Sequence, residues 1–120
     1  MVWRPMRRGE VRLVDLDPVK GAEANKRRPA VIVSNDAANS TAARLGRGVI
    51  TVVPVTSSVG RVYPFQVFLS AADTGLQRDS KAQAEQVRSV AIERVGTRLG
   101  SLPEAVSADL DEALRLHLAL

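Results

Sequence analysis

Short runs of β-branched and apolar residues, separated by loops that contain glycine, proline or polar residues, limit the possible folds of this chain more than any other feature. They cover residues 10–17, 30–34, 48–56 and 63–70, and a later run, residues 81–92, ends in RSVAI. Runs of this length and composition are typical of β-strands. Pro54 lies inside the third run, and we expect it at a bulge or an edge because proline cannot donate to a β-ladder.

The segment after residue 102 has a different period. Apolar residues recur there every four positions with charged residues between them, which predicts an amphipathic helix that begins near Pro103. The only histidine, His117, lies near the end of this helix, so we expect it beside the apolar face or at the helix C-terminus, where it interacts favourably with the helix dipole. The expected apolar face consists of Val106, Leu110, Leu114 and Leu118.

A second, shorter helix is expected in the alanine-rich stretch between the second and third runs. Asn35 and Asp36 are good N-cap residues, and Gly46 or Gly48 would end the helix. Four to six short strands and a terminal helix together predict a mainly β, α+β fold. In this fold a small, strongly curved sheet, partly closed into a barrel, packs against the terminal helix.

The chain is short and has no long apolar segment. Its 120 residues are the size of one domain, so we expect a single domain over residues 1–120, with residues 1–6 as a loose N-terminal extension. With 45% hydrophobic residues the chain is expected to fold, and no apolar run approaches the ~20 residues that cross a bilayer. No secretion signal is recognisable at the N-terminus. We therefore expect a soluble, cytoplasmic protein with no membrane partner.

Cysteine is absent from the chain and histidine occurs once, although these two residue types carry much of enzyme chemistry. The absence of cysteine excludes thiol nucleophiles, disulfides, cysteine-based zinc sites and iron–sulfur clusters. Carboxylates could hold magnesium, but Asp15, Asp17, Asp79 and Glu85 lie on different expected elements, so structural or groove-lining roles are favoured. We expect no metal site and no cofactor.

Arginine dominates the basic residues. It supplies 14 of the 17 basic side chains, in a chain of net charge +4, and a guanidinium binds two phosphate or carboxylate oxygens at once. Lys26, Arg27 and Arg28 stand in a row before Pro29 and the second strand. Such a run is usually a solvated surface, but a residue at the start of a buried strand is held by the sheet behind it. Arg28 is therefore the first candidate for a ligand-binding side chain.

Aromatic residues make up only 3% of the chain, so few side chains can stack on nucleobases. We expect Trp3, Phe65 and Phe68 to pack in the core, as aromatic residues of small β-domains usually do. Tyr63 stands at a turn, and we expect it to be exposed.

Six segments of the chain, taken together, carry a resemblance. They are RRGEV, VDLDPVKGAEANKRRPAVIVSND, GVITVVPVTS, YPFQVFLS, AEQVRSV and LDEALRLHL. In this order and spacing they resemble the MazF/PemK family of toxin endoribonucleases from bacterial toxin–antitoxin systems. The resemblance covers the chain from Arg7 onward, and it is specific because six segments carry it rather than one short motif. The second segment is similar to actinobacterial members with an EANxxRPAVVVSND pattern.

The resemblance implies a fold and two catalytic residues. The family fold is a small SH3-like or CcdB-like barrel, which agrees with the strand count, and it forms a homodimer with a groove for single-stranded RNA at the dimer face. In the family, an arginine of the RP motif and a threonine at the end of the following central strand carry the cleavage chemistry. The matching positions in this chain are Arg28 and Thr56.

The loop before the arginine would cover the substrate, and this chain departs from the family there. Many members have Gly-Ser-Glu in the loop, whereas this chain has Gly21, Ala22 and Glu23. A role for a serine hydroxyl at that position is therefore absent, or it falls to Ser57 or another residue. The covering loop would run from Gly21 to Arg27.

The reaction implied is metal-independent RNA cleavage, in which the ribose 2′-hydroxyl attacks the neighbouring phosphorus to give a 2′,3′-cyclic phosphate and a free 5′-hydroxyl. Arg28 can hold two phosphate oxygens, and Thr56 can donate a hydrogen bond to the developing charge. The family often assigns proton abstraction to the arginine, although a guanidinium stays protonated in proteins. Glu23 is chemically an easier base, and it could equally form an ion pair with Lys26 or Arg27.

Polar residues near these positions are the candidates for RNA contacts, because single-stranded RNA is read at its base edges. Gln86 matches a family motif position, and Lys81 and Arg78 could bind phosphates. Asn25, Gln77, Gln83 and Gln86 carry amides that could read base edges, although Gln77 is more simply an exposed residue without a partner. The candidate RNA-binding residues are Gly21, Glu23, Asn25, Lys26, Arg27, Ser57, Lys81, Gln83 and Gln86.

The function implied is that of a toxin that cleaves single-stranded mRNA, tRNA or rRNA at specific sequences. Its partner would be a small MazE-like antitoxin whose acidic, flexible tail competes with RNA for a basic groove. Two alternatives are open: a non-enzymatic poison of DNA gyrase on a related barrel, and an RNA-binding module without turnover. The gyrase poisons lack the arginine–threonine pair, so the presence of Arg28 and Thr56 ranks the nuclease first.

Overall fold

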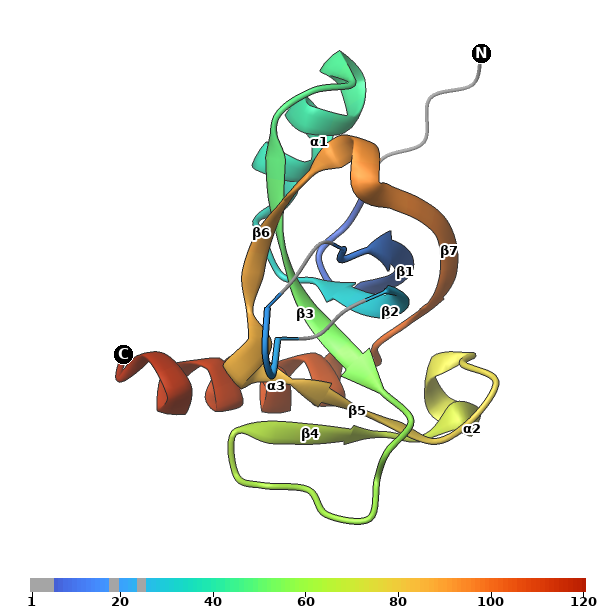
Figure 1. The fold of residues 1–120 in the computed structure, drawn as a ribbon, viewed down its shortest axis with the longest axis vertical. Helices are drawn as coiled ribbons and strands as arrows, with labels where there is room; N and C mark the ends of the chain where they lie inside the picture. Colours follow the sequence, from blue (N-terminus) through green and yellow to red (C-terminus); the bar gives the residue numbers. More distant parts are fainter. Residues whose placement is uncertain (1–5, 18–19, 24–25) are drawn as a thin grey trace.

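The computed structural model describes residues 6–17, 20–23 and 26–120. Its strands form one sheet, with a long C-terminal helix at one end and a shorter helix at the other (Figure 1). The strands are β1 (Glu10–Asp15), β2 (Arg27–Ile32), β3 (Val49–Thr56), β4 (Gln66–Leu69), β5 (Ser80–Gln83), β6 (Arg88–Ala91) and β7 (Val95–Ser101). The helices are α1 (Asp36–Leu45), α2 (Ala71–Thr74) and α3 (Glu104–Leu118), with two 3₁₀ turns, η1 (Ala84–Gln86) and η2 (Ile92–Arg94).

The sheet is antiparallel and strongly curved. Its order is β4-β5-β3-β2-β1-β7, and β6 pairs with the first half of β3. β3 pairs with β6 up to Val52 and with β5 from Val55, so Pro54 lies where the strand changes partners. A break in this ladder, rather than the expected bulge or edge, accommodates a residue that has no N–H, and on its other side Pro54 pairs with Ala30 of β2. The fold class, mainly β with a C-terminal helix, is confirmed.

Two buried clusters cover opposite faces of the sheet, because successive side chains of a strand point to opposite sides. Val53 belongs to the cluster that packs against Leu110 of α3, whereas Val52 belongs to the cluster that packs against Ala42 of α1. Burial of one such valine or leucine stabilises the fold by about 1.5–3 kcal/mol. The strands that carry the site are therefore held from both sides.

Both predicted helices are present. The Asn35 side chain accepts a hydrogen bond from the Ala38 N–H, and Gly46 ends α1 with a φ of +67°. His117 lies in the last turn of α3, as expected. No helix of the described residues is long and apolar enough to cross a membrane.

The expected apolar face of α3 is correct except at its end. Leu110 is buried, and Val106 and Leu114 pack against the core. Leu118, in contrast, is 49% exposed, because the last turn of α3 extends past the strands (Figure 1).

Several boundaries differ from the sequence-based expectation. β2 begins at Arg27, three residues early, because residues 27–29 pair with β1, so Arg27 and Arg28 lie in a strand rather than in a loop. The segment from residue 80 holds two strands, β5 and β6, where one was expected, and β6 matches the expected RSVAI strand. β7 and the single-turn helix α2 were not expected at all, and β1 and β4 are shorter than their runs.

The aromatic residues correct one expectation and confirm another. Phe68 is 47% exposed rather than buried, because it alternates with Val67 and Leu69, which face the core. Tyr63 is exposed, as predicted, and its ring stacks on that of the half-buried Phe65 with 5.4 Å between centroids. Trp3 lies outside the described residues.

Candidate functional site

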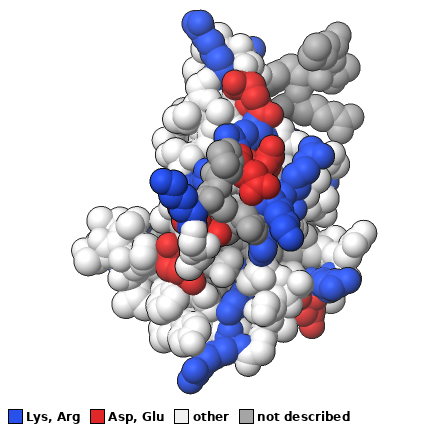
Figure 2. All heavy atoms as spheres, in the orientation of Figure 1, with Lys and Arg blue, Asp and Glu red and all other residues white. Residues whose placement is uncertain are grey.

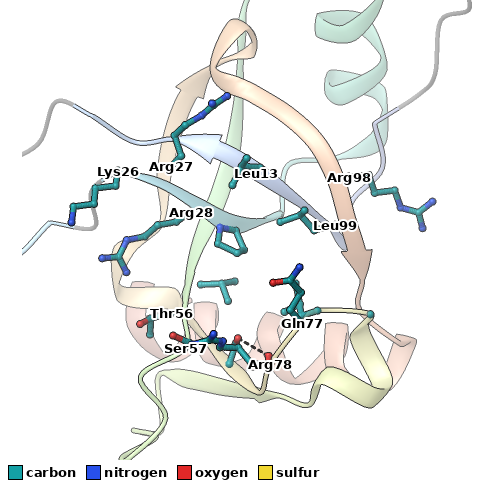
Figure 3. A pocket seen from close by; sticks show the side chains of 15 residues that line it. Leu13, Lys26, Arg27, Arg28, Thr56, Ser57, Gln77, Arg78, Arg98 and Leu99 are labelled. Atoms are coloured by element: carbon teal, nitrogen blue, oxygen red, sulfur yellow. Dashed lines mark hydrogen bonds between the residues drawn. The ribbon is translucent and has the colours of Figure 1, made fainter.

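A pocket of about 860 Å³ lies between the start of β2, the end of β3, the loop that joins α2 to β5, and β7 (Figure 3). One side, which we call the β2–β3 wall, consists of Lys26, Arg27, Arg28, Thr56 and Ser57. The opposite side, which we call the α2–β7 wall, consists of residues 75–78 with Arg98 and Leu99. Apolar side chains of Leu13, Pro29 and Val55 lie between the two walls.

The β2–β3 wall brings together the two residues predicted to be catalytic. Arg28 is half-buried in β2, opposite Val14 of β1, and Thr56 ends β3. The Thr56 Oγ1 accepts a hydrogen bond from the Ser58 N–H at 3.2 Å, which orients the hydroxyl and leaves its own proton to donate. In Figure 3 the polar ends of Arg28, Thr56 and Ser57 lie on the same side of the pocket.

The pocket is basic although the surface around it is not uniformly so. Five cations line it, Lys26, Arg27, Arg28, Arg78 and Arg98, and no Asp or Glu of the described residues does. Figure 2 shows Lys and Arg interleaved with Asp and Glu over the same face of the molecule. Cations that line a concave site with low-dielectric walls raise the local concentration of an anionic ligand. The cations of the lining therefore favour an anionic ligand in the pocket where the catalytic candidates lie.

The α2–β7 wall depends on a close approach of two backbones. A Cβ on Gly100 would overlap the carbonyl oxygen of Thr74, so only glycine lets β7 lie against the end of α2. Gly75, which follows, has a φ of +82°, a conformation that L-residues with side chains rarely adopt. Arg98 of this wall points away from the pocket in Figure 3, and its Nε lies 3.7 Å from Glu10 Oε2.

The structure places Lys81 away from the pocket. Only 8% of the residue is exposed, and its Nζ donates to the Arg61 carbonyl oxygen at 2.5 Å. Lys81 also lies 5.9 Å from the centroid of the Tyr63 ring. Its ammonium thus holds the segment between β3 and β4. Lys81 is also the residue paired with Thr56 in the sheet. Contact of this ammonium with phosphate stays a prediction.

Among the described residues, the other predicted RNA contacts do not line the pocket. Gln86 donates from Nε2 to the Ala22 carbonyl oxygen at 3.1 Å, and Gln83 is half-buried at the end of β5. Gly21 is an exposed turn residue with a φ of +59°. Asn25 lies outside the described residues.

Glu23 forms a local hydrogen bond rather than the ion pair considered for it. Its Oε1 accepts a hydrogen bond from the Lys20 N–H at 3.0 Å, which closes a turn. Within the described part of the chain, Glu23 forms no ion pair with Lys26 or Arg27 and does not line the pocket. The ion-pair alternative is therefore wrong for these residues, because the carboxylate faces the backbone of its own turn.

The other carboxylates singled out in the sequence have local structural contacts. Asp17 Oδ1 accepts from the Lys26 N–H at 2.8 Å, and Asp79 Oδ1 accepts from the Ala71 N–H at 2.9 Å. Glu85 Oε2 accepts from Gln66 Nε2 at 2.7 Å. Among the described residues, no three His, Cys, Asp or Glu side chains lie together as a metal site would require.

Comparison with known proteins gives the family. Residues 7–118 match the family described as "PemK-like, MazF-like toxin of type II toxin-antitoxin system". The chain is 67% identical to endoribonuclease MazF9 of Mycobacterium tuberculosis, over 96% of this chain and 98% of that protein. Among solved structures it is similar to MazF of Deinococcus radiodurans, with a TM-score of 0.80, 28% identity and coverage of 98% of this chain and 99% of the other.

A structure of a MazE–MazF complex from Deinococcus radiodurans is similar as well. Its TM-score is 0.73 at 25% identity, with 98% of each chain covered. The resemblance seen in six segments of the sequence therefore extends to the whole fold. The chain belongs to the PemK-like, MazF-like toxins of type II toxin–antitoxin systems.

Proposed function

We propose that this chain is a sequence-specific endoribonuclease that cleaves single-stranded RNA without a metal ion. Attack by the ribose 2′-hydroxyl would leave a 2′,3′-cyclic phosphate and a 5′-hydroxyl, and the target would be mRNA, tRNA or rRNA in the cytoplasm. One observation carries the proposal: Arg28 and Thr56 open into the same cation-lined pocket. The similarity to MazF9 of Mycobacterium tuberculosis, an endoribonuclease, supports it.

The residues of the β2–β3 wall suit this chemistry because the substrate brings its own nucleophile. The 2′-hydroxyl is already next to the phosphorus, so the protein has to orient the strand and stabilise charge. Arg28 would hold two phosphate oxygens as negative charge grows. Thr56, whose oxygen already accepts from the Ser58 N–H, would donate its proton to the same phosphate.

Proton abstraction is assigned in this proposal to Arg28 or Glu23. To act as the base, the Glu23 carboxylate would have to give up the hydrogen bond that it accepts from the Lys20 N–H. Glu23→Gln separates the two roles: a base role predicts loss of cleavage at saturating RNA. Arg28 as the base predicts that Glu23→Gln cleaves at nearly the parental rate.

The partners in this proposal are a second copy of the chain and an antitoxin. A MazE-like antitoxin with an acidic tail would bind over the five cations of the pocket and compete with RNA. The similarity to a MazE–MazF structure supports an antitoxin of this class. Of the remaining candidates from the sequence, Lys26, Arg27 and Ser57 would contact the strand inside the pocket. The others, Gly21, Glu23, Asn25, Lys81, Gln83 and Gln86, would contact it beyond the pocket.

The experiment is incubation of purified protein with a long single-stranded RNA in EDTA, followed by mapping of the ends. We expect cleavage at a recurring short sequence with 2′,3′-cyclic phosphate ends, and its loss in Arg28→Ala and Thr56→Ala. Intact RNA with the parental protein would instead favour a gyrase poison or a passive RNA-binding module. Cleavage that requires magnesium would contradict the active site proposed.

A further inference from the structure

Gln77 is the one uncharged polar side chain on the α2–β7 wall, and it lies across the pocket from Thr56. In Figure 3 its amide extends into the pocket below Leu99, between the two walls. Within the described residues its amide has no hydrogen-bond partner. Resting on the proposed function, we propose that Gln77 reads the edge of one RNA base next to the cleaved phosphate.

The loop that carries Gln77 is braced on both sides of it. Before it, the Leu76 N–H donates to Thr74 Oγ1 at 3.3 Å, and Leu76 itself is buried. After it, Ser80 Oγ donates to the Arg78 carbonyl oxygen at 3.0 Å. A polar group that is held by its supporting structure discriminates better than one on a mobile loop. The backbone that carries the amide is thus held in place on both sides.

The surroundings of Gln77 suit a base better than a phosphate. Leu99 offers apolar surface above the amide in Figure 3, and Leu13 and Pro29 also line the pocket, whereas Arg28 and Arg98 extend toward its outer edges. A volume of about 860 Å³ lies within the about 300–1,000 Å³ typical of small-ligand sites. The pocket therefore has room for a base beside the phosphate held by Arg28.

A side-chain amide is also suited to recognising the edge of a base. Its oxygen accepts while its nitrogen donates, so it pairs with a base edge that offers a donor beside an acceptor. An acidic peptide, the other ligand of a basic groove, binds mainly through carboxylates, which only accept hydrogen bonds and match the cations better than they match an amide. The arrangement therefore favours RNA at the α2–β7 wall.

The test compares base preference at each position of the cleaved sequence. The kcat/KM of the protein is measured for its preferred RNA and for RNAs with a single base changed, using the parental chain, Gln77→Met and Gln77→Glu. Gln77→Met keeps the length of the side chain but removes both hydrogen-bonding groups. Arg47→Gln, an exposed residue outside the pocket lining, is the matched surface control.

We expect both variants to lose about 5- to 100-fold of the discrimination at one position, through a lower kcat/KM on the preferred RNA, while the discrimination at the other positions changes little. An unchanged profile would overturn the proposal. A uniform loss at every position would overturn it too, because it would indicate a packing role.

Binding measurements keep this test separate from the proposed function. If the parental chain does not cleave, the nuclease proposal fails, and affinity for oligonucleotides of varied sequence then tests Gln77 in the same way. A loss of affinity in Gln77→Met for a synthetic glutamate-rich peptide, with base preference intact, would assign this wall to a peptide and contradict the inference.

Discussion

The two walls of the pocket differ in how the chain builds them. Arg28 lies in β2 and Thr56 lies in the neighbouring strand β3. The register of these strands, in which Ala30 is paired with Pro54, sets the separation between the two residues. Residues 75–78 meet β7 because two glycines permit the close approach of backbones far apart in sequence. The groups proposed for reaction thus depend on strand register, and the group proposed for recognition depends on tertiary contact. A substitution should therefore be able to disturb one wall and spare the other.

The largest effect is expected from Arg28→Ala on the β2–β3 wall. Loss of the guanidinium removes charge stabilisation from the developing phosphorane, and we expect kcat to fall about 100- to 1,000-fold. Arg28→Lys keeps the charge but not the bidentate geometry, so it should recover only part of the rate. Single-turnover cleavage of a short RNA measures the rates of both variants. Full activity in Arg28→Lys would show that charge alone suffices.

Thr56→Val is expected to lower kcat by about 10- to 100-fold, because the isosteric side chain cannot donate to the phosphate. Thr56→Ser keeps the hydroxyl and should stay within a few-fold of the parental rate. The preferred sequence should be the same in both variants, since the α2–β7 wall is untouched. A changed sequence preference in Thr56→Val would contradict the division between the walls.

Gly100→Ala tests the opposite wall. The new methyl group would overlap the Thr74 carbonyl oxygen, and such overpacking typically lowers the free energy of unfolding by about 1–3 kcal/mol. We expect weaker base discrimination with a smaller effect on kcat. Gly60→Ala is the matched control, because a Cβ there meets no atom within 4 Å. Thermal unfolding measures the loss of stability, and the cleavage profile measures the loss of base discrimination. Equal stability of Gly100→Ala and Gly60→Ala would refute the close approach of Gly100 to the Thr74 carbonyl oxygen.

The smallest effects concern the cations of the two walls. If one RNA strand crosses the pocket, Arg27→Ala and Arg78→Ala should each lower the slope of log affinity against log salt by about 0.7. Arg47→Ala should leave the slope unchanged, because Arg47 does not line the pocket. Fluorescence anisotropy with a labelled RNA at several salt concentrations gives the slopes, and an effect confined to one wall would place the strand there.

The β2–β3 wall was predictable from the sequence, whereas the α2–β7 wall was not. Arg28 stands out in the sequence as a cation beside a proline and a run of β-branched residues, and the family resemblance singled out Thr56 at the end of the next such run. β7 escaped prediction because two glycines interrupt its seven residues and because it is defined by pairing with the distant β1. α2 has only four residues, too few to show a helical period.

Lys81 shows a second limit of sequence reasoning. A lysine in a short strand is expected at the surface. Lys81 is instead buried, and its ammonium donates a hydrogen bond to the Arg61 carbonyl oxygen in the segment between β3 and β4. Gln77 was interpreted as a residue without a partner, and the structure agrees for the described residues. What the sequence did not indicate is that its amide extends into the pocket.

The central claim, that one RNA strand contacts both walls, is tested most directly by NMR titration. The protein is titrated with a short RNA of the cleaved sequence that carries 2′-deoxyribose at the cleaved position, which prevents reaction. The account predicts that the Thr56 amide, the Arg28 side chain and the Gln77 side-chain NH₂ shift together with the same dissociation constant. Shifts at Arg28 and Thr56 without any at Gln77 would contradict it.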